Sequence, residues 1–179
     1  MMDNQSNAVE PVKKKSRTVS IVFFGLSMLI GLLVSLTNLF DGLGFDWIIY
    51  ESGLIAFLSL LFIVSILIYS NKLTMLGSVI GAIGFTVDVI ILFSIGYYGG
   101  FPDAFFVISG MLWVVFFALY TVKNLTNKMN DFILITVAVL AGVFDVLGGG
   151  ISSVPLYMPF TVACVFLVLN GIKGGKQTP

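Results

Sequence analysis

The 179-residue sequence contains no histidine, one cysteine and few charged residues, which make up only 10% of the chain. The absence of histidine excludes haem ligation by histidine, histidine–zinc sites and imidazole acid–base chemistry within this chain. The single cysteine, Cys164, excludes an internal disulfide, an iron–sulfur cluster and a Cys-x-x-Cys redox pair. Nine basic residues balance nine acidic ones, and a chain without a basic surplus is not expected to bind nucleic acid.

Hydrophobic residues are abundant, at 58% of the chain with a mean hydropathy of +1.08. Soluble globular domains contain about 45–50% apolar and about 25% charged residues. The composition therefore predicts an all-α integral membrane protein, solvated mainly by the lipid bilayer.

A membrane-spanning helix needs about 20 apolar residues, and six segments meet this length. They cover residues 19–40, 47–69, 73–97, 103–122, 132–150 and 154–172. We expect a polar and basic cytoplasmic tail at 1–18, a six-helix transmembrane domain at 19–172 and a cytoplasmic tail at 173–179. The domain divides into helical hairpins 19–69, 73–122 and 132–172.

The basic residues predict the orientation, because all nine lie on one side of the six segments. The opposite side carries Asp41, Asp46 and Asp103 and no Lys or Arg. The positive-inside rule therefore places both termini in the cytoplasm and the protein in the cell membrane. The basic residues are Lys13, Lys14, Lys15, Arg17, Lys72, Lys123, Lys128, Lys173 and Lys176.

An internal repeat relates the first, third and fifth segments. In each, a small residue precedes a polar residue by seven positions, and further matches relate the second, fourth and sixth segments. We therefore expect three parallel hairpins with a pseudo-threefold axis near the membrane normal. The pairs of positions are Gly31 and Asn38, Gly81 and Asp88, and Ala138 and Asp145.

Small residues form a seam along one face of the third segment and of the fifth. Membrane helices associate through close packing of small residues and through interhelical hydrogen bonds, so both seams are expected to face the interior. Each seam carries one carboxylate. The seam residues are Gly77, Gly81 and Gly84 with Asp88, and Ala138, Ala141 and Gly148 with Asp145.

The hairpin pattern resembles the short repeat of HdeD-type acid-resistance membrane proteins. The stretch Gly-Val-Phe-Asp-Val-Leu-Gly-Gly-Gly at 142–150, followed by Pro155, carries the resemblance, and Gly-Phe-Thr-Val-Asp-Val-Ile at 84–90 with Pro102 looks like a second copy. The first hairpin departs from the pattern, with Asn38 in place of the acid and no proline in its loop. The resemblance implies a six-helix inner-membrane protein linked to acid stress, and it supplies no catalytic residues.

Asp88 and Asp145 are the candidate intramembrane polar or proton-binding residues, with Asn38 at the corresponding place in the first hairpin. An ionisable residue inside a membrane segment is a functional hypothesis by default. No Lys or Arg lies near them along the chain. Keeping an aspartate protonated at neutral pH costs about 4 kcal/mol, and burying it charged costs about 2.5–3.5 kcal/mol, so both states stay open.

Three interpretations follow for these residues. In the first, they are internal hydrogen-bonding groups that fix the helices through neighbours such as Ser109 and Trp113. In the second, they bind a proton or cation in a transporter or channel. In the third, the chain is an accessory subunit of a larger membrane complex, and a homo-oligomer also stays open. No nucleophile–base pair is present, so we expect no enzyme, no catalytic residue and no cofactor.

Several other residues receive plainer interpretations. We expect Glu51 to be a solvated acid at the membrane interface, and its spacing from Asp41 and Asp46 matches no known calcium loop, so no metal site is expected. Phenylalanine is interpreted as lipid-facing. Aromatic residues near the outer ends are expected to form an interfacial belt; these are Trp47, Tyr50, Tyr97, Tyr98 and Tyr157.

Overall fold

The structure is a computed structural model that describes residues 6–40, 47–95 and 101–170, and the regular structure in these ranges is entirely helical. Five helical stretches are long and apolar enough to cross a membrane, and the last of them, Asp131–Asn170, includes two α-helices and the short 3-10 helix between them. The prediction of an all-helical chain with several apolar helices of membrane-spanning length is therefore confirmed, and these helices are compatible with a multi-pass membrane protein. The elements are α1 (Ser6–Phe40), α2 (Trp47–Leu67), α3 (Asn71–Ile95), α4 (Phe101–Thr126), α5 (Asp131–Gly149), η2 (Gly150–Ser153) and α6 (Val154–Asn170).

The helix boundaries differ from the expected ones mainly at α1, which begins at Ser6 rather than at residue 19. Extending an existing helix avoids the cost of nucleation, and the preceding segment contains Ala, Glu and three consecutive Lys, which favour helix. Pro102 and Pro155 each occupy the second position of their helices, α4 and α6. A proline in the first turn of a helix loses no hydrogen bond there.

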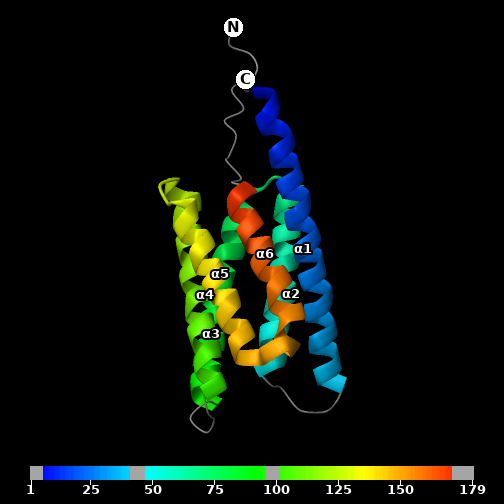
Figure 1. The fold of residues 1–179 in the computed structure, drawn as a ribbon, viewed down its shortest axis with the longest axis vertical. Helices are drawn as coiled ribbons and strands as arrows, with labels where there is room; N and C mark the ends of the chain where they lie inside the picture. The colour runs from blue at the N-terminus through cyan, green and yellow to red at the C-terminus, as the bar shows by residue number, and fades with distance from the viewer. Residues whose placement is uncertain (1–5, 41–46, 96–100, 171–179) are drawn as a thin grey trace.

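The helices form a closed ring in chain order. Each α-helix packs against the next, and α6 packs against α1. Figure 1 shows the helices running along the long axis, with the start of α1 and the end of α6 at the same end of the bundle. We call this the terminal end. The opposite end, where α1 finishes and η2 lies, is called the far end.

The glycines of α3 lie where neighbouring helices approach closely. A Cβ atom at Gly81 would lie 2.8 Å from the Phe117 ring of α4, and one at Gly84 would lie 2.6 Å from Leu54 of α2. A Cβ atom at Gly77 would lie 3.0 Å from a ring carbon of Phe62 on α2. Ala138 and Ala141 of α5 are fully buried, and Gly148 would place its Cβ 3.0 Å from Phe106. Both seams therefore face neighbouring helices.

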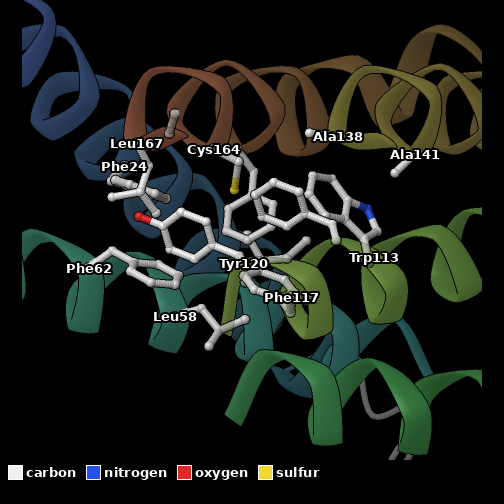
Figure 2. Close-up of a cluster of buried hydrophobic side chains, with 14 of the residues drawn as sticks. Phe24, Leu58, Phe62, Trp113, Phe117, Tyr120, Ala138, Ala141, Cys164 and Leu167 are labelled. Carbon is white, nitrogen blue, oxygen red and sulfur yellow. The ribbon is translucent and has the colours of Figure 1, made fainter. Parts of the chain in front are cut away.

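The interior of the ring is filled by aromatic side chains, which we call the aromatic core. Successive ring centroids lie 5.1–6.2 Å apart around a closed path through α1, α2, α4, α3 and α6. Figure 2 shows Trp113 and Phe117 between the ribbons, with Ala138 and Ala141 on the α5 side. The interpretation of phenylalanine as lipid-facing is wrong for these residues, because aromatic rings pack well against the small-residue seams. The core comprises Phe24, Phe62, Phe85, Trp113, Phe116, Phe117, Tyr120 and Phe160.

Basic side chains bind helix ends at the terminal end. The Arg17 guanidinium donates to the Ile66 carbonyl and lies 3.4 Å from the Tyr69 ring centroid. Lys123 Nζ lies 2.5 Å from Asp131 Oδ1 and donates to the Val168 carbonyl at 3.3 Å. Cations near the last carbonyls of a helix interact favourably with its dipole. These contacts join the ends of α2, α4, α5 and α6 to their neighbours.

Candidate functional site: a buried acidic cluster

Three acidic side chains from three helices converge near the far end of the ring. Glu51 lies four residues into α2, Asp88 lies seven residues before the end of α3, and Asp145 lies four residues before the end of α5. Their exposed fractions are 3%, 0% and 1%. Each of the three is close enough to the other two for their charges to interact. We call these three residues the acidic cluster.

Two of the three carboxylates accept a hydrogen bond from an aromatic donor. Tyr157 of α6 donates its hydroxyl to Glu51 Oε2 at 2.6 Å, and Trp113 of α4 donates its indole N–H to Asp145 Oδ2 at 2.9 Å. Trp113 is one of the two neighbours that the sequence suggested. The other, Ser109, donates to the Ala141 carbonyl at 2.9 Å, one turn from Asp145.

Asp88 has no hydrogen-bond partner on either carboxylate oxygen, although the residue is fully buried. The helix α4 packs against it at Gly110, where a Cβ atom would lie 3.7 Å from Asp88 Oδ2. A glycine brings the two backbones together but offers no side-chain donor. Tyr50 of α2 donates its hydroxyl to the Gly84 carbonyl at 3.0 Å and not to Asp88. The hydrogen-bonding interpretation therefore has a donor for Asp145 and none for Asp88.

No basic side chain contacts the acidic cluster in the part of the chain that the structure describes. Within these residues, Lys123 and Asp131 form the one ion pair, and they lie at the terminal end. Arg17 also bonds at that end, through the Ile66 carbonyl. A buried charge without a partner is costly, so ionisation of the cluster is opposed both by desolvation and by mutual repulsion.

Asn38 does not join the cluster as its place in the repeat suggested. Its side chain is half-buried, and its amide donates to the Val34 carbonyl of the same helix at 2.7 Å. The position of α1 is the reason: it packs against α2 and α6, and Asn38 follows Gly31 and Ser35 along the face that contacts α2. Its amide bonds within its own helix.

Glu51 and Tyr157 are the functional candidates that sequence reasoning missed. Glu51 was expected in solvent and Tyr157 in an interfacial belt, but both are 3% exposed and bonded to each other. Glu51 shares a helix face with the buried residues Ile55, Leu58 and Phe62. Because α2 is apolar on every face, no pattern in the sequence distinguished its inner face. Tyr97 and Tyr98 lie outside the described residues.

The arrangement suits proton binding better than metal binding. In the described ranges, no group of three or more His, Cys, Asp or Glu side chains has the geometry to hold a metal ion. Asp41 and Asp46, the other acids considered for calcium, lie outside these ranges. Carboxyl groups close to one another and removed from water favour sharing protons rather than all being ionised.

The aromatic core separates the acidic cluster from the terminal end. On each of four helices, a core residue lies nearer the terminal end than the residue that belongs to the acidic cluster or bonds to it. The pairs are Phe62 and Glu51 on α2, Phe85 and Asp88 on α3, Phe116 and Trp113 on α4, and Phe160 and Tyr157 on α6. All four phenylalanines are fully buried. The cluster is therefore closed on the terminal side by tightly packed rings.

Comparison of the chain with protein-family models, curated proteins and solved structures gave no match.

Proposed function

We propose that the chain is a non-enzymatic, six-helix membrane protein of HdeD-like type that responds to acidification through its acidic cluster. In this proposal α5 and α6 each cross the membrane, and the three hairpins are related by a pseudo-threefold axis. The termini are cytoplasmic, and the far end faces the outside of the cell membrane. The role belongs to acid or envelope stress, and the lipid bilayer is the only partner that the proposal requires.

The observation that carries the proposal is the convergence of three buried carboxyl groups with no basic partner among the described residues. Each proton that binds removes one buried negative charge and relieves its repulsion with the other two. The cluster lies about 6–10 Å along the helix axes from the far end, at 1.5 Å per residue. Acidification at that side would therefore reach the cluster over a short distance.

A passive response is favoured over proton- or cation-coupled transport, the alternative function. A transported ion would have to cross the aromatic core, whose side chains are fully buried and contact one another. Transporters instead place irregular backbone and polar groups along the pathway. In liposomes loaded with a pH-sensitive dye, we expect no proton flux above that of empty liposomes, and sustained flux would favour the transporter.

The proposal predicts that acid stabilises the folded protein. The native state binds more protons than the unfolded state, so the free energy of unfolding falls as the pH rises. Relief of about 1–2 kcal/mol of repulsion should raise the melting temperature by about 2–8 °C between about pH 8 and about pH 5. The measurement is thermal unfolding of the detergent-solubilised protein across this range.

The matched control is Asp131→Asn, which removes an acid whose partner is Lys123 at the terminal end. This variant should keep the acid stabilisation of the cluster. The triple variant Glu51→Gln, Asp88→Asn, Asp145→Asn should lose it. An unchanged pH profile in the triple variant would refute the proposed acid response.

A further inference from the structure

We propose that Asp88 is the proton-binding group of the acidic cluster, and that Trp113 and Tyr157 are positioning residues that keep Asp145 and Glu51 as its anionic partners. The inference rests on the proposed function and adds which of the three acids takes the proton. It also assigns a role to two aromatic side chains.

The hydrogen bonds distinguish the three acids. Tyr157 donates its hydroxyl to Glu51 Oε2 at 2.6 Å, a short O–H···O hydrogen bond. The Trp113–Asp145 bond, at 2.9 Å, also brings a donor to a carboxylate oxygen. Such donors favour the ionised form of the group they contact. Asp88 has no donor on either oxygen and is fully buried, so nothing offsets the cost of its charge.

A proton on Asp88 also removes a buried charge. The protonated carboxyl becomes an O–H donor, and the charges that interact with Asp88 are those of Glu51 and Asp145. The other titratable groups facing the cluster are Tyr50 from α2 and Tyr157 from α6. From α4 the neighbours are Gly110 and Trp113, and neither titrates.

An internal correspondence explains why Asp88 lacks the donor that Asp145 has. An offset of 57 residues relates Asp88 to Asp145 and also Ser52-Gly53 to Ser109-Gly110. The structure keeps the match, since the corresponding carbonyls of Gly84 and Ala141 each accept a hydrogen bond from the preceding helix. At the same offset, Trp113 corresponds to Ala56. The position that supplies a donor to Asp145 from α4 is held on α2 by an alanine, which has no side-chain donor.

The alanine at this position follows from the packing of α2 against α1. A Cβ atom at Gly31 would lie 3.1 Å from the Ala56 Cβ and 2.6 Å from the Ser52 carbonyl oxygen. An indole ring does not fit in this contact. The close approach of α1 and α2 thus keeps position 56 small and without a hydrogen-bond donor.

Infrared difference spectroscopy on the reconstituted protein tests the assignment, because a protonated carboxyl group has a carbonyl stretch separate from that of a carboxylate. Acidification from about pH 8 to about pH 5 should produce one such band in the unsubstituted protein. The band should disappear in Asp88→Asn and persist in Asp145→Asn and in the terminal-end control Asp131→Asn. Persistence in Asp88→Asn, or loss in Asp145→Asn with retention in Asp88→Asn, would overturn the inference.

Two further variants keep the test decisive. If Asp88→Asn does not fold, Asp88→Glu should shift the band, whereas Asp145→Glu should leave its position unchanged; the reverse result would overturn the assignment. Trp113→Phe removes the indole donor to Asp145 and should increase the band, because the ionised form of a second carboxyl then has less support. An unchanged band would refute the positioning role. Absence of any band in the unsubstituted protein would instead refute the proposed function itself.

Discussion

At the scale of single residues, the buried acids differ in what contacts them rather than in how deeply they lie. Asp88 and Asp145 are both essentially inaccessible to solvent. Asp145 accepts the indole N–H of Trp113, whereas Asp88 faces Gly110 and has no donor. Removing one member of a buried hydrogen bond leaves the other unsatisfied, at a cost of about 1–3 kcal/mol. Removing a side chain with no partner carries no such cost.

This difference predicts opposite outcomes for one substitution at two positions. Asp145→Leu should lower the melting temperature, by about 2–12 °C, because the Trp113 N–H loses its acceptor. Asp88→Leu should leave the melting temperature at neutral pH unchanged or raised, because it removes an unpartnered acid. Thermal unfolding of the two variants in the same detergent measures the contrast. Equal destabilisation by both would contradict the hydrogen-bond assignment.

At the scale of helices, small residues determine which side chains fill the ring. The seams of α3 and α5 were predicted from the spacing of Gly and Ala alone, since helix association in lipid depends on such residues. What packs onto them could not be predicted, because phenylalanine is distributed over all faces of nearly uniform apolar helices. The inner face of α2 was hidden for the same reason, and with it Glu51.

The seam at Gly81 is a direct test of this packing. Gly81→Ala would place a methyl group 2.8 Å from the ring of Phe117, which is fully buried and stacked on Phe62 and Phe85. Overpacking of this kind should cost about 1–3 kcal/mol. The matched control is Gly25→Ala on α1, where nothing lies within 4 Å of the added Cβ. Equal melting temperatures for the two variants would contradict the close packing of α3 against α4.

At the scale of the whole molecule, charge is divided between the two ends of the bundle. Arg17 and Lys123, the basic side chains whose contacts the structure describes, lie at the terminal end, and the acidic cluster lies toward the far end. The sequence predicted this division from the positions of Lys and Arg relative to the apolar segments. It did not predict which acids meet, because contacts between α2, α3, α5 and α6 depend on closure of the ring. Asn38, which the repeat related to the acids, stays apart from them and bonds to its own helix, α1.

The most direct measurement of the central claim, that the buried acids have no basic partner, compares Asp88→Lys with Asp88→Met. The two side chains have similar length, and only lysine carries a charge that Glu51 and Asp145 would neutralise. At about pH 8, the lysine variant should be more stable by about 1 kcal/mol or more, which is about 2–4 °C in melting temperature. A lysine variant that melts at or below the methionine variant would show that the acids are already neutralised, or that Asp88 does not face them.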